Sequence, residues 1–171
     1  MDFMELAKKR YSVRKFSDKA VEKEKLDLIL EAGNIAPTAK NLQPQRIYVL
    51  QNKDALAKLD TLTHCRYGAP VVLIFTYNTD EEWKNSLEAG IHSGVEDVSI
   101  VATHIMLEAA ELGLDTCWVN YYPNSALEQL FNLPANEKSV LIMPLGYAAA
   151  DAEPAPLHSV KKDISETVKY L

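Results

Sequence analysis

The sequence predicts an α+β domain in which helices pack around a central sheet. Helical patterns outnumber strand patterns, and the two kinds follow one another irregularly along the chain. The run from Val71 to Tyr77 is rich in β-branched and aromatic residues, which is typical of a strand covered on both faces. With 171 residues, of which 47% are hydrophobic and 25% charged, and no shift in composition, we expect one domain over residues 1–171.

The N-terminal half of the chain shows three helical patterns and two strand-like runs. We expect helices over residues 2–10, 21–32 and 54–62, and strands over residues 47–50 and 71–77. The second helix is expected to stop at Gly33, because glycine commonly follows the last helical residue. Residues 11–20 are predicted to form an irregular basic segment, and residues 34–45 a polar loop.

The C-terminal half is predicted to hold three further helices and two strands. Thr79 and Glu82 have the spacing of a capping box, which predicts a helix near residues 80–90. The other helices are expected over 95–112 and 124–131, and the strands over 116–119 and 140–145. The tail, residues 150–171, is rich in alanine and proline and then charged, and its end is compatible with a short helix.

The helix over residues 95–112 carries apolar side chains nearly all round its axis. An amphipathic surface helix would show one apolar stripe instead, so this helix must be covered on every side. One subunit of this size supplies such cover with difficulty. We therefore favour a partner subunit against this helix over burial within a single chain.

Composition and charge narrow the class of partner. The net charge of −6 argues against nucleic acid as the main partner, although local basic clusters still allow a small phosphate ligand. No apolar stretch approaches the ~20 residues of a membrane-spanning helix, and no signal-peptide pattern follows Met1. The two cysteines lack paired spacing, and no Asn-x-Ser/Thr site occurs, so we expect a reduced, cytoplasmic protein.

Common catalytic and metal-binding signatures are missing from the sequence. It contains no G-x-G-x-x-G turn, P-loop, H-E-x-x-H or G-x-S-x-G pattern. His64 and Cys65 are adjacent, and adjacent residues rarely bind one ion, so no metal site is predicted. Cys117 is interpreted as a small buried hydrophobic residue.

Two segments point to a ligand. In residues 8–16, Arg10, Ser12 and Arg14 alternate, so an extended backbone would direct them to the same side as an anion clamp. The alternative is a solvated basic face. The second segment, residues 37–45, carries Asn41, Gln43 and Gln45 together with two prolines that stiffen it, and we name it the amide loop. Its amides suit the edge of a planar heterocycle, although they could equally cap a helix or bind water.

Together these segments resemble the nitroreductase family of flavoproteins. The resemblance is carried by the runs RYSVRKF at 10–16, APTAKNLQPQ at 36–45, GLDTCWV at 113–119 and PLGY at 144–147, in order along nearly the whole chain. It implies an α+β three-layer sandwich with a central mixed sheet, built as an intertwined homodimer. Two FMN molecules would lie at the dimer interface, each touched by both chains.

The resemblance also implies an activity. Such proteins take a hydride from NADH or NADPH onto FMN and reduce a small-molecule electron acceptor, such as a nitroaromatic or quinone, by a ping-pong mechanism. No nucleophile or acid is obligatory, so the catalytic side chains are left open. The alternatives are an FMN-binding carrier or sensor of the same fold without nicotinamide turnover, and a metal- or nucleotide-binding module of unrelated fold.

Carried over to this chain, the resemblance implies a cofactor site made from both subunits. Arg10 and Ser12 would hold the FMN phosphate, and Arg14 would lie nearer the pyrimidine edge, where a cation tunes the cofactor. The other subunit would contribute Thr38, Asn41 and Gln43. The flanking residues that we also expect to border the cofactor are Tyr11, Pro37 and Ala39.

The C-terminal half would complete the site. Asn120 and Tyr121 would pass the flavin N5 edge, where larger relatives often carry an acidic residue followed by glycine. Tyr121 and Tyr122 could instead line the substrate pocket. Gly146 would allow close backbone approach, and Lys161 or Lys162 would complete the phosphate clamp at a position that is often arginine.

Overall fold

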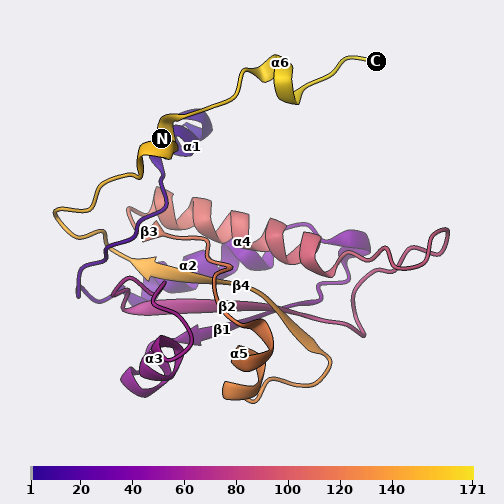
Figure 1. The fold of residues 1–171 in the computed structure, drawn as a ribbon, viewed down its shortest axis with the longest axis horizontal. Helices are drawn as coiled ribbons and strands as arrows, with labels where there is room; N and C mark the ends of the chain where they lie inside the picture. The colour runs from indigo at the N-terminus through magenta and orange to yellow at the C-terminus, as the bar shows by residue number, and fades with distance from the viewer. Residues whose placement is uncertain (1) are drawn as a thin grey trace.

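A four-stranded sheet separates two layers of helices in the computed structural model, which describes residues 2–171 (Figure 1). The strand order is β1-β2-β4-β3, and every neighbouring pair is antiparallel. The strands are β1 (Gln45–Leu50), β2 (Val71–Asn78), β3 (Asp115–Thr116) and β4 (Glu137–Gly146). The α-helices are α1 (Phe3–Lys9), α2 (Lys23–Asn34), α3 (Lys53–Asp60), α4 (Gly94–Glu111), α5 (Asn124–Leu130) and α6 (Ile164–Thr167).

The two faces of the sheet bury different helices, which confirms the three-layer sandwich. Successive residues of β2 point to opposite faces. Leu73 and Phe75 therefore pack in the cluster that contains α2 and α4, whereas Val72 and Ile74 pack with α3 and α5. All of β2 from Val71 to Tyr77 is buried, as the apolar run predicted.

The sheet is less mixed than the resemblance implied. Its four strands are antiparallel, and within residues 2–171 the parallel pairing is confined to an isolated bridge between Ser12 and Thr116. Beside this bridge the Val13 N–H donates to the Thr116 carbonyl at 3.0 Å. The basic segment after α1 is thereby fixed against the edge strand β3.

Gly33 does not end α2, contrary to the prediction. The helix continues to Asn34, and Gly33 lies buried inside it. A Cβ atom at Gly33 would lie 2.6 Å from the Cδ1 atom of Ile105 on α4. The glycine therefore serves the close packing of α2 on α4 rather than helix termination.

The helix expected near residues 80–90 is also wrong, because both capping residues have other partners. The Thr79 hydroxyl donates to the Asn136 carbonyl at 3.1 Å. The Glu82 carboxylate contacts residues that follow it in the chain. It lies 2.6 Å from His92 Nδ1 and accepts the Gly94 N–H at 3.2 Å. Residues 79–93, which we call the arm, are irregular and carry one isolated bridge between residues 84 and 92.

The strand expected over 116–119 is shortened by a proline on its neighbour. β3 covers only Asp115–Thr116, although Val119 forms a further bridge with Ile142. Between them the Cys117 N–H donates to the Pro144 carbonyl at 3.2 Å. Because proline has no N–H to return, the ladder is interrupted there.

Helix α4 has one buried face and one open face in a single chain. Val98, Val101 and Ile105 are fully buried against the sheet and α2, whereas Val95 is 48% and Ile100 38% exposed. One chain therefore leaves part of this apolar helix uncovered.

No helix within residues 2–171 is both long and apolar enough to cross a lipid bilayer.

Candidate functional site

The anion clamp, defined as Arg10, Ser12 and Arg14, follows directly from α1. Asp2 and Glu5 form a capping box that starts the helix, and Arg10 lies at its C-cap in extended conformation. The bridge from Ser12 to β3 keeps the next residues extended. The extended backbone at Arg10 and Ser12 is the conformation in which alternating residues point to the same side.

The three clamp residues influence the ionisation of one buried thiol, that of Cys117. Burial raises the pKa of the Cys117 thiol, while the positive charges of Arg14 and Arg10 and a hydrogen bond with Ser12 act in the opposite direction. The positive charges of both guanidinium groups thus act on the same thiol, and the anion clamp itself stays a prediction.

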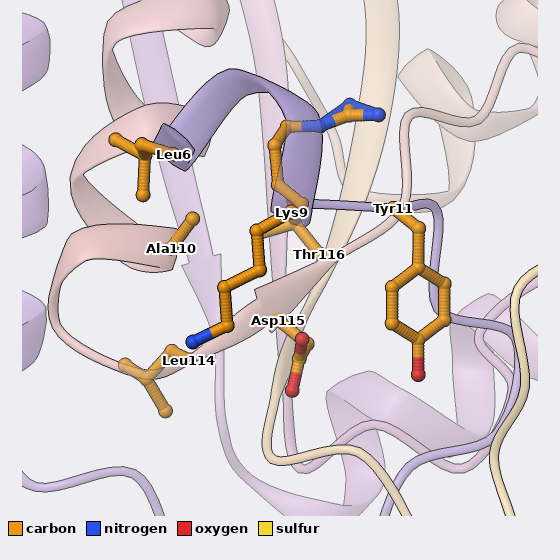
Figure 2. A pocket seen from close by; sticks show the side chains of 8 residues that line it. Leu6, Lys9, Tyr11, Ala110, Leu114, Asp115 and Thr116 are labelled. Carbon is orange, nitrogen blue, oxygen red and sulfur yellow. The ribbon is translucent and has the colours of Figure 1, made fainter. Parts of the chain in front are cut away.

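Arg10 is half-buried and lacks an anionic partner. Its Nη1 atom donates to the Met106 sulfur at 3.4 Å, a weak acceptor, and its Nε is buried without a hydrogen-bond partner. Arg10 also borders a cavity of about 130 Å³. Figure 2 shows Leu6, Ala110 and Leu114 on one side of this cavity and Tyr11 on the other, with Asp115 below.

Arg14 is exposed, and its Nη1 donates to the Ser12 carbonyl at 3.3 Å. Within residues 2–171, neither Arg10 nor Arg14 forms an ion pair with a carboxylate, whereas the neighbouring Lys15 pairs with Asp151. Two guanidiniums without carboxylate partners suit a phosphate group, because each can give forked hydrogen bonds to its oxygens.

The amide loop contains a short 3-10 helix and an unusual backbone. Lys40, Asn41 and Gln43 have φ angles of 52°, 55° and 52°, in the left-handed region. The Gln43 N–H donates to Thr38 Oγ1 at 3.1 Å, and the Gln43 amide donates to the Asn41 carbonyl at 3.3 Å. Asn41, Gln43 and Pro37 are exposed, and the buried Gln45 Oε1 has no partner. The Asn41 and Gln43 side chains are thus accessible at the surface of the loop, as a role toward a polar ring edge requires.

The clamp and the amide loop lie at opposite ends of α4. Arg10 contacts Met106 near the C-terminal end, whereas the Ala39 N–H donates to Asp97 Oδ1, at 2.8 Å, in the first turn. Nine residues of helix separate these contacts, a rise of about 14 Å. A single chain therefore does not bring the two predicted halves into contact.

Asn120 and Tyr121 differ in availability. The Asn120 oxygen accepts the Trp118 indole N–H at 2.7 Å, and its amide nitrogen donates to the Val140 carbonyl at 2.7 Å. Its side chain is therefore engaged within the chain. Tyr121 is 75% exposed and lies edge-on to His64, with 6.0 Å between ring centroids.

Tyr122, the other candidate for a substrate-lining role, is 8% exposed. Burial raises the pKa of Tyr122 to about 12. Its ring belongs to the core beneath the sheet, although one edge borders a hollow shared with Leu62, Asn120, Tyr121 and Pro123. Of the two rings, Tyr121 is the accessible one.

The remaining predicted site residues, Gly146, Lys161 and Lys162, belong to the C-terminal part of the chain. A Cβ atom at Gly146 would lie 2.8 Å from Pro70 Cδ, so packing explains this glycine within the chain, and its role toward a cofactor stays a prediction. Lys161 and Lys162 are exposed, and Lys161 donates to the His158 carbonyl at 2.8 Å. His158 lies edge-on to Tyr11, with 6.1 Å between ring centroids, so the tail passes the clamp before it leaves the body (Figure 1).

Asp97 and Met106, which contact the two predicted halves of the site, were not predicted from the sequence. An acidic residue in a first helical turn ordinarily complements the helix dipole, so nothing in the sequence marked Asp97 as a loop contact. Met106 was one apolar residue among many in its helix. Within residues 2–171 no group of three or more His, Cys, Asp or Glu side chains could hold a metal ion.

Comparisons with known proteins agree on one family. The profile of the nitroreductase family matches residues 7–67 and 66–147. A Methanothermobacter thermautotrophicus protein, provisionally named NADH dehydrogenase/NAD(P)H nitroreductase, is 33% identical over 87% of this chain and 78% of its own length. A solved nitroreductase family protein of Clostridium difficile 630 is 39% identical, covers 99% of this chain and 98% of its own, and has a TM-score of 0.93.

A solved structure described as an FMN-dependent nitroreductase, from Clostridium difficile R20291, is 29% identical to this chain. The similarity covers 94% of this chain and 99% of the other, with a TM-score of 0.72.

Proposed function

The chain belongs to the nitroreductase family, and from this premise we propose that it is an FMN-dependent oxidoreductase. It takes hydride from NADH or NADPH and reduces nitroaromatic, quinone or similar acceptors by a ping-pong mechanism. The observation that carries the proposal is Arg10, whose buried Nε has no acceptor in the chain and whose Nη1 meets only a sulfur. An added anion would supply the acceptor that this guanidinium lacks within the chain.

In this proposal the clamp holds the phosphate of FMN. Arg10 and Arg14 supply charge-assisted N–H donors, and Ser12 adds a neutral donor. Arg14, which is exposed, extends toward the pyrimidine edge. Lys161 or Lys162 adds a further cation, because the tail passes Tyr11 immediately before these lysines.

The second half of the site comes from a second copy of the chain. The amide loop cannot reach the clamp of its own chain, because about 14 Å of α4 separates their contacts. The open face of α4 and the exposed apolar residues of the tail, such as Ile164 at 74% exposure, supply surface for an intertwined homodimer. Thr38, Asn41 and Gln43 then approach the cofactor held by the partner.

When bound, FMN supplies hydride acceptance and the return of electrons to a second substrate. The chain's own residues bind and orient. The clamp fixes the phosphate end, the amide loop fixes the polar ring edge, and the exposed Tyr121 ring borders a slot for planar substrates. Donor and acceptor use this slot in turn, which accounts for a ping-pong order.

The absorption spectrum tests the proposed function. We expect the purified protein to be yellow and its flavin bands to bleach when NADH or NADPH is added without oxygen. Bands that persist with both nicotinamides would indicate a flavin carrier or sensor without turnover. A colourless protein that gains no thermal stability from added FMN would contradict cofactor binding itself.

A further inference from the structure

A buried carboxylate on α4 holds the amide loop by its backbone. Asp97 is 2% exposed. Its Oδ1 accepts the Ala39 N–H at 2.8 Å, and its Oδ2 accepts the Ser93 hydroxyl at 2.6 Å. No cation pairs with Asp97 in the part of the chain that the structure describes. A buried carboxylate requires hydrogen bonds, and one of these two comes from the loop.

The loop needs an external anchor because its backbone is strained. The backbones of Lys40, Asn41 and Gln43 lie in the left-handed region, which residues other than glycine rarely adopt. Such conformations persist where surrounding contacts enforce them, and they concentrate at ligand-binding positions. Three of the five non-glycine residues with positive φ in the described chain fall in this loop.

The loop's other hydrogen bonds do not tie it to α4. The Gln43 N–H donates to Thr38 Oγ1, and the Asn41 N–H donates to the Thr38 carbonyl at 2.9 Å, so both bonds are internal. At the far end, Arg46 donates to the Gln43 carbonyl at 3.4 Å and links the loop to β1. The Asn78 N–H also donates to the Pro44 carbonyl at 2.8 Å, which ties the loop to β2. Among the described residues, the bond from Ala39 to Asp97 is therefore the hydrogen bond that joins the loop to the long helix.

We propose that Asp97 is a positioning residue for FMN binding, which holds the amide loop in its strained conformation before the cofactor arrives. The inference rests on the proposed function, since it takes the loop to contact FMN. It assigns Asp97 no contact with FMN or substrate. Pre-organisation of this kind improves affinity because the loop does not have to be ordered during binding.

Three variants, Asp97→Ala, Asp97→Asn and Ser93→Ala, test this inference, and a fourth variant, Val98→Ala, serves as the control. Asp97→Ala removes both acceptors, whereas Asp97→Asn keeps an oxygen for the Ala39 N–H. Val98→Ala is the matched control, because Val98 is adjacent, fully buried and part of the core rather than the loop contact. The third variant, Ser93→Ala, removes the hydroxyl on the other oxygen. FMN is titrated into each apoprotein, and the Ala39 amide exchange is followed by NMR without FMN.

We expect Asp97→Ala to weaken FMN binding by about tenfold or more and to speed exchange of the Ala39 amide. Asp97→Asn should restore both properties nearly to wild type, and Ser93→Ala should fall between the two. Val98→Ala should lower the melting temperature without changing FMN affinity. Equal FMN affinity in wild type and Asp97→Ala, or loss of affinity in Asp97→Asn as large as in Asp97→Ala, would overturn the inference.

Two further outcomes separate this inference from the proposed function. If the wild-type apoprotein does not bind FMN, the proposed function fails and this inference fails with it. If the wild type binds FMN but Asp97→Ala does not fold, amide exchange in the wild type decides. An Ala39 amide that exchanges as fast as that of Glu88, on the exposed arm, would then overturn the role of Asp97.

Discussion

Arg10 is the single residue on which the proposed cofactor site most depends. A buried N–H without an acceptor is costly, and Arg10 retains one although the weak Met106 sulfur is its other contact. The sequence could indicate this residue, because alternation with Ser12 and Arg14 suggested a common side. It could not indicate Met106 or Cys117 as neighbours, since contacts between distant segments depend on the fold.

Replacing Arg10 tests the clamp. We expect Arg10→Ala to weaken FMN binding, because each charge-assisted hydrogen bond is worth roughly 1.5–3 kcal/mol. The dissociation constant should rise by about ten- to a hundredfold per bond lost, measured by titrating FMN into the apoprotein. Lys15→Ala is the control, since Lys15 faces Asp151 in an exposed ion pair and should leave the affinity unchanged. Equal affinity in both variants would remove the clamp assignment.

At the scale of elements, hydrophobic periodicity predicted the helices and strands whose formation depends mainly on residues near in sequence. Helices α1, α3, α4 and α5 and the buried strands β2 and β4 lie close to where periodicity predicted them. The helix at 80–90 failed because Thr79 and Glu82 satisfy their hydrogen bonds with Asn136, His92 and Gly94 instead of each other. Asn136 is distant in sequence, and His92 and Gly94 follow the irregular arm. A capping-box pattern, which considers only neighbouring residues, therefore cannot predict these partners.

The contact between α2 and α4 is expected to carry much of the stability. Ile105→Ala should lower the free energy of unfolding by about 2–5 kcal/mol, because Ile105 is fully buried and the substitution leaves a cavity. Denaturant unfolding at one fixed protein concentration measures this change. The control Leu87→Ala, at a side chain that is 95% exposed, should change the free energy by less than about 0.5 kcal/mol. Similar losses in the two variants would contradict this account of the core.

For the whole molecule, one chain carries the two halves of the proposed site at opposite ends of α4, so they do not meet. The sequence suggested a second subunit through the apolar residues around α4, and the structure leaves Val95 and Ile100 exposed. It also leaves the tail largely uncovered, beyond the body of the fold (Figure 1). Periodicity reveals that an apolar surface exists, but only three-dimensional packing reveals which part of it remains open.

Removing residues 160–171 tests the role of the tail in the proposed dimer. We expect the full chain to sediment at about twice its mass of 19.1 kDa, and the truncated chain to dissociate at the same concentration. The physical reason is the loss of exposed apolar side chains such as Ile164 and Tyr170, which is 96% exposed.

A charge variant separates apolar from basic contributions in the same tail. Lys161→Ala combined with Lys162→Ala should keep the dimer while it weakens FMN binding. A truncated chain that sediments like the full chain would show that the tail does not hold the dimer.

The placement of the clamp and the amide loop at opposite ends of α4 has a genetic consequence. In the proposed dimer, a copy defective at Arg10 still carries a sound loop, and a copy defective at Asp97 still carries a sound clamp. When both are expressed together, each mixed dimer pairs one sound clamp with one sound loop and concentrates both lesions in its other site. Two alleles that each weaken FMN binding should therefore complement each other, whereas two lesions within the same half should not.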